Sequence, residues 1–288
     1  MRASAPSTFA LVNGEAGGDL SVLDRGLHFG DGVFETIACL HHRPRFLALH
    51  LERLTHGCRV LGFPPPAAHL LREELERLAG VQARSIVKLI VTRGPALVRG
   101  YAVSGSEQAT RLMIRYPWPV EDPNLWRQGV NVRIAAVRLG ENPALAGLKH
   151  CNRLEQILAR AEPGAAEAAE ALMFSRSGKL VSGTMTNVFL IDGPAQAPRL
   201  RTPAIDLCGV AGIMRRVVLR EAANAGLSAH EADLWPADVA AASEVFLTNA
   251  RVGIWPVRRI EQRTLTPGPL TRRLQGLLQP LLAEPADG

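Results

Sequence analysis

Lysine is scarce in this 288-residue sequence, because only three of its 33 basic residues are lysines. Arginine keeps its proton at any pH at which proteins work, so it cannot replace lysine where a neutral amine is needed. Chemistry that depends on such an amine therefore has three candidates, Lys88, Lys149 and Lys179. The formal net charge of +6 reflects a composition rich in arginine and indicates no particular partner by itself.

Cysteine is also sparse, and its spacing excludes two kinds of site. The four cysteines form no CxxC pair, which argues against a zinc site and, in a chain of this length, against a disulfide scaffold. This usage is typical of a reducing compartment, so we expect a cytoplasmic protein. The cysteines are Cys39, Cys58, Cys151 and Cys208.

Long hydrophobic runs and basic clusters with interleaved aromatics are missing too. No stretch approaches the ~18 apolar residues of a membrane span, and residues 1–14 lack the apolar core of a signal peptide. The arginine pairs at 215–216, 258–259 and 272–273 are scattered. We therefore expect neither a membrane nor a nucleic acid as a partner.

The composition that is present predicts two folded domains. A hydrophobic content of 47% excludes disorder over most of the chain. The proline-rich segment 117–123 lacks periodicity, and we expect it to link an N-terminal α/β domain (1–116) to a larger C-terminal domain (124–288). Helices and strands alternate without a strict βαβ repeat, which predicts an α+β, or mixed α/β, fold.

Hydrophobic periodicity predicts the main elements. Asn152 and Glu155 have the spacing of a capping box at the start of one helix, whose apolar face consists of Leu154, Ile157, Leu158 and Ala161. Helices are expected at 47–61, 69–78, 152–162, 212–225 and 269–282. Strands are expected at 9–12, 33–40, 86–92, 112–116, 130–139, 171–174, 188–191 and 244–247.

Polar residues interrupt the apolar strand that follows the turn Gly30-Asp31-Gly32. A dinucleotide-binding loop would follow a strand and open a helix, and this turn does neither. Glu35 and Thr36 project from opposite faces of the strand. Burial of either without a partner would cost about 1–3 kcal/mol, so we expect at least one of them to face a cavity.

Lys149 has the most unusual setting of the three lysines, at the entrance of the helix at 152–162. The positive end of a helix dipole disfavours a cation, and together with partial burial it would favour a neutral, nucleophilic amine. Lys88 lies within a strand and Lys179 in a turn, where surface roles are expected.

Three segments contain groups able to hold a phosphate. GVAGIMRR opens a helix after glycine-rich residues, so its free backbone N–H groups and its dipole form an anion site. Arg53 on the first long helix offers a guanidinium, and Thr248-Asn249 at the end of a strand offers a hydroxyl. The sequence does not show whether these groups converge.

Sequence blocks that carry these residues resemble a known family. They are, in order, LVNG, SVLDRGLHFGDGVFET, HLERL, VTRG with RGY, LKHCNRLEQ, LVSGTMTNVFL, GVAGIMR and EVFLTNA, and they run over residues 9–257. They resemble the fold-type IV pyridoxal-phosphate enzymes, the class IV aminotransferase family. LKHCNRLEQ and GDGVFET are most similar to its aminodeoxychorismate lyases. The resemblance implies a two-domain fold, pyridoxal 5′-phosphate as cofactor and a homodimer.

The resemblance also implies residue roles. Lys149 is similar to the lysine that carries the cofactor covalently and then transfers the proton. Asn187 lies in a block beside the cofactor ring. The phosphate-binding groups of the family are similar to Arg53, the backbone amides of Ile213 and Met214, and the hydroxyl of Thr248.

Ser182 departs from the family pattern, which usually has a glutamate five residues before Asn187 to keep the pyridine nitrogen protonated. Serine supports no full positive charge there, so the ring becomes a weaker electron sink. Transamination needs that sink more than a pyruvate elimination that is driven by aromatisation. Ser182 thus favours a lyase, as does Thr36, where branched-chain aminotransferases tend to have glycine.

The implied function is elimination of pyruvate from 4-amino-4-deoxychorismate, which yields 4-aminobenzoate for folate biosynthesis. Lys149 would remove the proton and Thr36 would assist its delivery, while Arg93, Arg99 and Tyr101 would bind the carboxylates of the substrate. Two alternatives stay open. One is a D-amino-acid or branched-chain aminotransferase of the same fold, and the other is a non-catalytic basic binding module.

Overall fold

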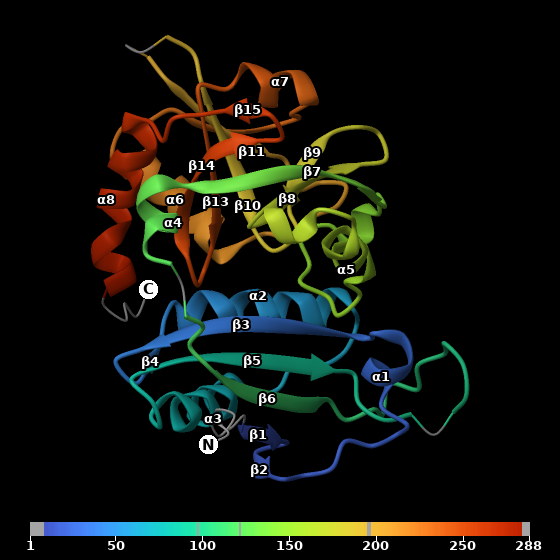
Figure 1. Ribbon diagram of the computed structural model, residues 1–288. Helices are drawn as coiled ribbons and strands as arrows, with labels where there is room; N and C mark the ends of the chain where they lie inside the picture. The colour runs from blue at the N-terminus through green and yellow to red at the C-terminus, as the bar shows by residue number, and fades with distance from the viewer. Residues whose placement is uncertain (1–8, 97, 121, 195–196, 284–288) are drawn as a thin grey trace. The chain divides into compact units, whose positions relative to one another are not determined.

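The chain divides into two compact units (Figure 1). The computed structural model describes residues 9–96, 98–120, 122–194 and 197–283. The first unit comprises 1–120, 148–152 and a C-terminal segment from Leu281, and the second comprises 121–147 and 153–280. Glu121, in the segment expected as a linker, lies outside the described residues. Residues 148–152, expected in the C-terminal domain, belong to the first unit.

A six-stranded antiparallel sheet forms the first unit, in the order β2-β1-β6-β5-β3-β4. Its centre is β3 (Gly32–Leu40) against β5 (Arg84–Thr92), which are paired along their whole length. Apolar and β-branched residues dominate both strands, as a half-buried sheet requires. The other strands are β1 (Phe9–Val12), β2 (Glu15–Ala16), β4 (Arg43–Pro44) and β6 (Thr110–Pro117).

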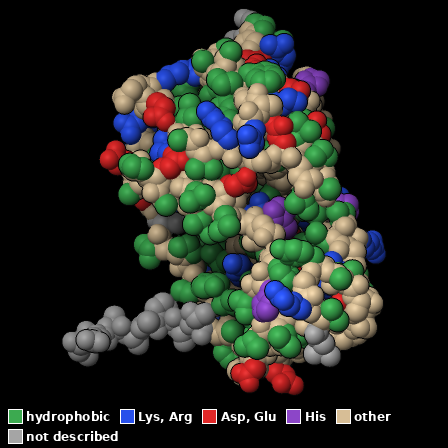
Figure 2. Space-filling model, turned by 90° about the vertical axis from the view of Figure 1, so that its right-hand side faces the viewer, with side chains coloured by type: hydrophobic (Ala, Val, Ile, Leu, Met, Phe, Trp, Pro, Cys, Tyr) green, Lys and Arg blue, Asp and Glu red, His purple; other side chains and the backbone are tan. Residues whose placement is uncertain are grey.

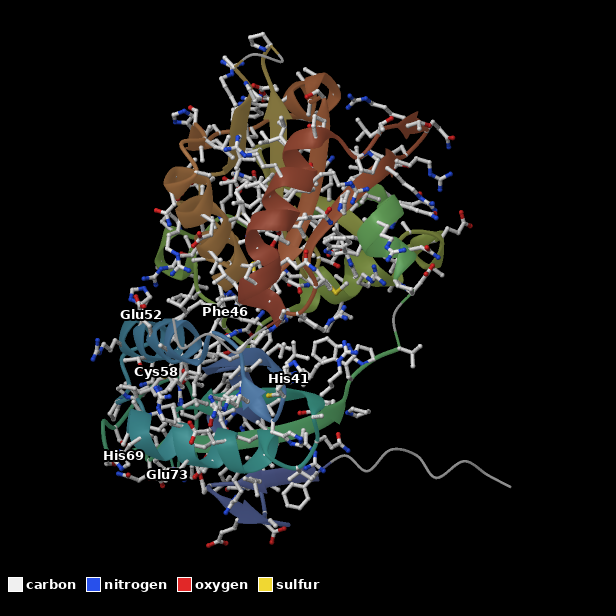
Figure 3. The ribbon with its side chains drawn as sticks, turned by 90° about the vertical axis from the view of Figure 1, so that its left-hand side faces the viewer. His41, Phe46, Glu52, Cys58, His69 and Glu73 are labelled. Carbon is white, nitrogen blue, oxygen red and sulfur yellow. The ribbon has the colours of Figure 1, made fainter. Side chains whose placement is uncertain are left out.

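Two helices, α2 (Leu47–Val60) and α3 (Ala68–Ala79), pack their apolar sides on one face of this sheet. Cys58 on α2 is fully buried in this core, whereas Glu52 on the same helix is exposed (Figure 3). Because successive residues of a strand face opposite sides, Glu35 points toward α2 and Thr36 points away from it. The short helix α1 (Arg25–Phe29) precedes β3.

The second unit is built on a mixed sheet in the order β12-β11-β10-β13-β14-β7-β8-β9, with β15 paired to β14. The strand β7 runs parallel to both β8 and β14, and β11 runs parallel to β12. The strands β8, β9 and β10 are buried at every residue, as expected for near-continuous apolar runs covered on both faces. The strands are β7 (Val130–Leu139), β8 (Glu170–Ser175), β9 (Leu180–Gly183), β10 (Asn187–Asp192), β11 (Arg199–Pro203), β12 (Ala229–Ala232), β13 (Glu244–Asn249), β14 (Gly253–Ile260) and β15 (Arg263–Thr264).

Helices of the second unit surround this sheet. In the core, the rings of Phe189 and Phe246 stack with their centroids 4.8 Å apart. The last helix, α8 (Pro269–Ala283), begins where the Glu244 carboxylate accepts hydrogen bonds from the amides of Leu270 and Thr271. The remaining helices are α4 (Asn124–Gln128), α5 (Leu154–Ala161), α6 (Ile213–Asn224) and α7 (Pro236–Ala241), with 3₁₀ turns at Pro143–Leu145 and Ala165–Glu167.

The mixed α/β class expected from the sequence is confirmed, and the five expected helices are present within two residues at each end. Among the missed elements, β14 is the longest. Its run contains Pro256, and a proline within an apolar stretch argues against a strand. Among the described residues, no helix is long and apolar enough to cross a membrane.

The start of α5 differs from the expected capping box. Arg153 occupies the N-cap position and makes no side-chain capping bond. The side chain of Asn152 instead donates to the carbonyl oxygen of Gly30 at 3.3 Å. Glu155 accepts from the amide of Gly140 at 2.7 Å. Both expected capping side chains are therefore used to fix other segments.

The apolar face of α5 is the second difference. Leu154 is 72% exposed, Ile157 59% and Leu158 58%, although the spacing of these residues is that of a core-facing stripe. Only Ala159 of this helix is buried. The periodicity predicts the helix correctly, and the face that it predicts as buried is open within this chain.

Candidate active site

Lys149 lies on a segment that pairs with the edge of β3. The amide of Phe34 donates to the carbonyl oxygen of Lys149, and the amide of Cys151 donates to that of Gly32, each at 2.9 Å. The side chain of Lys149 also contacts β3, since its Nζ lies 4.3 Å from the centroid of the Phe34 ring. The expected position at a helix entrance is wrong, because α5 begins five residues later.

Lys88 shares this aromatic ring. Its Nζ lies 5.1 Å from the same Phe34 centroid, and Lys88 is the direct register partner of Thr36 on the neighbouring strand. Two of the three lysines and a hydroxyl thus lie on one face of the first sheet. A surface role was expected for Lys88, because an isolated lysine within a strand carries no signal of its cross-strand neighbours.

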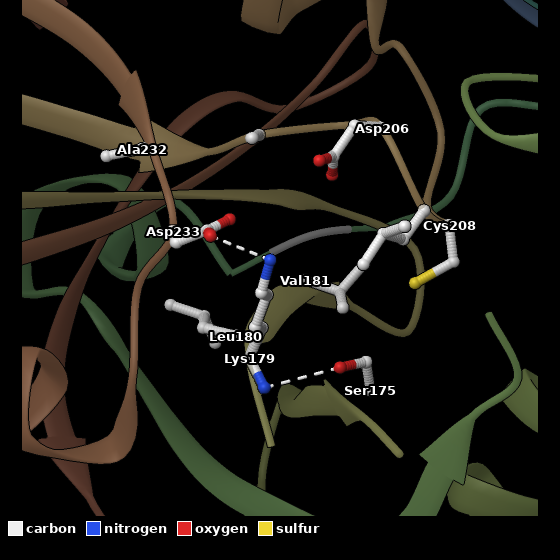
Figure 4. Close-up of a pocket in the computed structure, with 10 residues that line it drawn as sticks. Ser175, Lys179, Leu180, Val181, Asp206, Cys208, Ala232 and Asp233 are labelled. Atoms are coloured by element: carbon white, nitrogen blue, oxygen red, sulfur yellow. Dashed lines mark hydrogen bonds and ion pairs between the residues drawn. The ribbon is translucent and has the colours of Figure 1, made fainter. Parts of the chain in front are cut away.

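Lys179, the third lysine, is committed to an ion pair. Its Nζ lies 2.7 Å from the carboxylate of Asp233, at a small pocket that also includes Asp206 and Cys208 (Figure 4). Hydrogen bonding to Asp233 raises the pKa of Lys179. Its amine is therefore held in the charged form, which is unsuited to nucleophilic or basic chemistry.

Arg53 is oriented by a buried carboxylate that the sequence singled out for another reason. Glu35 is 1% exposed, and its Oε1 accepts from Nε of Arg53 at 2.7 Å while its Oε2 accepts from Nη2. The same Oε2 accepts from Nδ1 of His50 at 2.6 Å. A cavity is thus not needed to explain Glu35, because this buried carboxylate is paired with the Arg53 guanidinium and hydrogen-bonded to His50.

The pKa values of this cluster follow from burial and charge. Burial raises the pKa of Glu35, but the positive charge of Arg53 and the hydrogen bonds with His50 and Arg53 outweigh it and lower the value to about 2. Burial lowers the pKa of His50, and the attraction of Glu35 offsets this only in part. At neutral pH Glu35 is therefore ionised, and His50 is neutral with its proton on Nδ1.

Arg93, expected to bind substrate, is fully engaged elsewhere. Its Nε donates to the carboxylate of Asp31 at 2.8 Å, and its Nη atoms donate to the carbonyl oxygens of Leu61 and Gly62. Arg25 donates to the same Asp31 oxygen at 2.8 Å. Nε and Nη2 of Arg93 thus bind the Gly30-Asp31-Gly32 turn through Asp31, and Nη1 binds the segment after α2 at Gly62. The role of Arg93 in substrate binding stays a prediction.

Arg99 and Tyr101 lie on an exposed loop after β5. Arg99 is exposed and the Tyr101 side chain is 85% exposed, with its ring centroid 5.2 Å from that of Phe29. The guanidinium of Arg25 donates to the carbonyl oxygens of Gly100, Tyr101 and Ala102 and so fixes the loop backbone. Their role in substrate binding stays a prediction.

The start of α6 in the second unit has the features of an anion site. Gly212 is its N-cap and supplies no side-chain cap. The buried amides of Ile213 and Met214 have no acceptor among the described residues. Asn187 fixes the approach by donating to the carbonyl oxygen of Val210 at 2.9 Å, and a Cβ on Gly212 would lie 1.9 Å from Asn187 Oδ1. Only glycine fits at 212, and it leaves the helix N-terminus accessible.

Ser182 and Thr248 differ in what their hydroxyls do. Ser182 lies on β9 opposite Met173, and its hydroxyl has no hydrogen-bond partner among the residues that the structure describes. Thr248 is fully buried, and its hydroxyl donates to the carbonyl oxygen of Gly253 at 2.6 Å. This bond links the hydroxyl to the turn between β13 and β14, and the phosphate contact expected of Thr248 stays a prediction.

Each unit brings its own set of candidate residues together. The first unit holds Lys149, Thr36, Lys88 and the Glu35–Arg53 pair, and the second holds Ser182, Asn187 and the start of α6. The model of the family described as amino-transferase class IV matches residues 32–260. The chain belongs to the class IV aminotransferase family.

Relatives within the class IV family include both lyases and aminotransferases. An aminodeoxychorismate lyase of Vibrio harveyi is 33% identical over 93% of this chain and 98% of the relative. The crystal structure of 4-amino-4-deoxychorismate lyase from Pseudomonas aeruginosa matches with a TM-score of 0.89 and 42% identity, over 96% of this chain and all of that one. A putative branched-chain-amino-acid aminotransferase of Methanocaldococcus jannaschii is 30% identical over 89% of this chain and 88% of its own length.

Pyridoxal 5′-phosphate is the cofactor of class IV aminotransferases, and the donor set of this chain fits it. An aldehyde needs a primary amine, which Lys149 offers on the ring face of Phe34. A phosphate needs a guanidinium and free amides, which Arg53 and the start of α6 offer. In the described part of the chain, no cluster of His, Cys, Asp or Glu has the arrangement of a metal site.

Proposed function

We propose that this class IV family member is an aminodeoxychorismate lyase, which releases pyruvate from 4-amino-4-deoxychorismate and forms 4-aminobenzoate for folate biosynthesis. The observation that carries the proposal is similarity along nearly the whole chain to lyases from Vibrio harveyi and Pseudomonas aeruginosa. Ser182 supports it from within the chain, because a neutral hydroxyl suits an elimination better than a transamination.

The chemistry divides between cofactor and protein. When bound, pyridoxal 5′-phosphate holds the amino nitrogen of the substrate and withdraws electrons from the adjacent carbon. The amine of Lys149 removes the proton from that carbon. The electron pair completes the aromatic ring as the ether C–O bond breaks, and the departing enolpyruvate takes up a proton to become pyruvate. Thr36, the register partner of Lys88 on the neighbouring strand, is assigned to assist the proton delivery.

The phosphate is assigned to the groups that resemble those of the family. Arg53 supplies the positive charge, and the amides of Ile213 and Met214 supply the dipolar end of α6. Asn187 holds the segment before that helix. The hydroxyl of Ser182 is assigned to the ring nitrogen as a hydrogen-bond donor without charge.

The first prediction concerns Lys88, which we assign to a carboxylate of the substrate. Its ammonium shares the Phe34 ring with Lys149, so a dianionic substrate at Lys149 lies within its reach. Lys88→Met is expected to raise KM by about 10- to 100-fold, because a charge-assisted hydrogen bond contributes about 1.5–3 kcal/mol, while kcat changes less. Steady-state assays of 4-aminobenzoate formation measure both constants.

The matched variant for that prediction is Lys179→Met, which removes an amine paired with Asp233 instead. Its KM is expected to stay within about twofold of the wild type, as for a surface change. A normal KM in Lys88→Met would show that Lys88 does not contact the substrate.

The proposed reaction is tested by incubating the purified holoenzyme with 4-amino-4-deoxychorismate. Equal amounts of 4-aminobenzoate, measured by fluorescence after chromatography, and pyruvate, measured with lactate dehydrogenase, are expected. Formation of keto acid from D-alanine or from leucine without 4-aminobenzoate would identify the protein as an aminotransferase, a class to which the Methanocaldococcus jannaschii relative is assigned.

A homodimer is part of the proposal, supported by exposed apolar side chains within each unit. The stripe of Leu154, Ile157 and Leu158 on α5 is more than half exposed, and Val22 and Leu27 near α1 are 74% and 63% exposed. Figure 2 shows hydrophobic side chains spread among charged ones on one face of the molecule. A symmetric contact would bury such a surface twice.

Ile157→Glu is therefore expected to convert a dimer into a monomer at micromolar concentration, because two carboxylates would enter the contact. Sedimentation velocity of the wild type and the variant measures this. A wild type that sediments as a monomer would contradict the proposal. The cytoplasm is the proposed compartment, since none of the four cysteines is in a disulfide, and fractionation of the source cells tests it.

A further inference from the structure

Glu35 is a buried charge that touches neither of the catalytic groups proposed above. It is 1% exposed, and its carboxylate makes an ion pair with Arg53 and accepts a hydrogen bond from His50. Burial of a carboxylate costs free energy unless the charge is fully paired. The partners of Glu35 therefore indicate what this charge does in the structure.

The contact with Arg53 fixes the plane of the guanidinium. Two of its three nitrogens, Nε and Nη2, donate to the two oxygens of Glu35. A guanidinium held at two points can no longer rotate about its last side-chain bonds. The plane of the guanidinium is therefore fixed, and the Arg53 side chain is 13% exposed.

The contact with His50 fixes Glu35 in turn. His50 and Arg53 lie three residues apart on α2, so their side chains project from one side of the helix toward β3. Nδ1 of His50 donates to Oε2 of Glu35 at 2.6 Å, and the buried Nε2 has no partner among the described residues. The bond to the carboxylate is the one hydrogen bond that the His50 ring makes among the described residues. Because burial lowers the pKa of His50, the ring makes this bond without adding a charge.

We propose that Glu35 is a positioning residue for phosphate recognition, which holds the guanidinium of Arg53 in the orientation that a phosphate monoester requires. The proposal rests on the cofactor and on the phosphate role of Arg53 in the proposed function. Glu35 itself contacts no ligand. The consequence is specific: loss of Glu35 weakens binding of the phosphate group and leaves the rest of the cofactor unaffected.

Cofactor binding with and without the phosphate tests this proposal. The apoprotein is titrated with pyridoxal 5′-phosphate and, separately, with pyridoxal, and each Kd is read from the absorbance of the bound chromophore. Glu35→Gln is expected to raise the Kd of pyridoxal 5′-phosphate about 10- to 100-fold, as for loss of one well-placed charged hydrogen bond. The Kd of pyridoxal is expected to change less than about threefold, because pyridoxal lacks the group that Arg53 contacts.

The chain offers a matched control in Glu74, which is 6% exposed and accepts from Nη2 and Nε of Arg111 at 2.8 and 3.3 Å. Glu74→Gln breaks a similar buried pair in the same unit, and both Kd values are expected to stay near those of the wild type. Arg53→Gln should reproduce the effect of Glu35→Gln, and the double variant should lose no more than either single one.

Equal weakening of both ligands, an unchanged Kd for pyridoxal 5′-phosphate, or additive losses in the double variant would each overturn the proposal. If Glu35→Gln does not fold by circular dichroism, Glu35→Asp keeps the charge but shortens the reach, and the same phosphate-specific loss is expected. The outcome is separable from the proposed reaction. A wild type that binds the cofactor but forms no 4-aminobenzoate would refute the lyase and leave this test intact.

Discussion

Replacing Lys149 by alanine is expected to abolish both the colour of the bound cofactor and the formation of 4-aminobenzoate. The variant lacks the amine that would hold the aldehyde and remove the substrate proton. Loss of a positioned acid–base group alone lowers rates by about 10²- to 10⁴-fold, and loss of covalent attachment adds to this. The visible absorbance of the bound cofactor measures the loss of colour, and the 4-aminobenzoate assay measures the loss of activity.

Borohydride reduction of the wild type followed by peptide mass mapping locates the attachment directly. A reduced adduct is expected on Lys149. The other two lysines are controls: Lys179 is paired with Asp233, and Lys88 lies one strand away from Thr36. An adduct on Lys88, or a coloured Lys149→Ala protein, would contradict the assignment, since all three lysines of the chain are then accounted for.

Local signals were sufficient for the five main helices, including the uncapped start of α6. The heptad-like spacing from Leu47 defines α2, and the glycine before Ile213 marks a helix with uncapped amides. Both features depend on residues within a few positions of one another. Such short-range patterns are set by backbone geometry, so they survive without knowledge of the rest of the fold.

Long-range pairing decided what the sequence missed. Lys149 was placed at a helix entrance, but its segment pairs with β3, more than a hundred residues earlier. The pairing of Arg93 with Asp31, across 62 residues, also carries no local signal. In each case the partner arrives from a different element.

Glu35 illustrates what a sequence can and cannot indicate. Its polarity on an apolar strand correctly indicated that it needs a partner or a cavity. The partners His50 and Arg53, three residues apart on a helix, are recognisable as one face, but only the packing of α2 on β3 brings that face to Glu35. A histidine and an arginine at this spacing near a buried carboxylate is a signal worth testing in other sequences.

Glu170 carries the second large prediction, which concerns the turn between β9 and β10. Its side chain is fully buried and accepts five hydrogen bonds, with no cation paired to it among the described residues. Three donors are backbone amides, of Ala171, Thr184 and Met185, and two are the hydroxyls of Thr184 and Thr186. The carboxylate thereby shapes the turn that joins Ser182 to Asn187.

Glu170→Ala is expected to lower the free energy of unfolding by about 4 kcal/mol or more, because each buried amide left without an acceptor costs about 1–3 kcal/mol. The midpoint of thermal unfolding should fall by about 10 °C in calorimetry. Glu170→Gln keeps one acceptor oxygen but turns an NH₂ group toward donors, so an intermediate loss is expected. Glu167→Ala, three residues away at an exposed position, should change stability by less than about 0.5 kcal/mol.

Cofactor binding by Glu170→Gln distinguishes a local effect on the turn from a general loss of stability. If the Glu170 carboxylate shapes the turn, folded Glu170→Gln should bind pyridoxal and pyridoxal 5′-phosphate more weakly by similar factors, because Ser182 and Asn187 flank the turn and are assigned to the ring side of the cofactor. This pattern is the opposite of the phosphate-specific loss expected for Glu35→Gln. Two buried glutamates, each surrounded by donors, are thus expected to act on different ends of one cofactor, and the ratio of the two Kd values separates them.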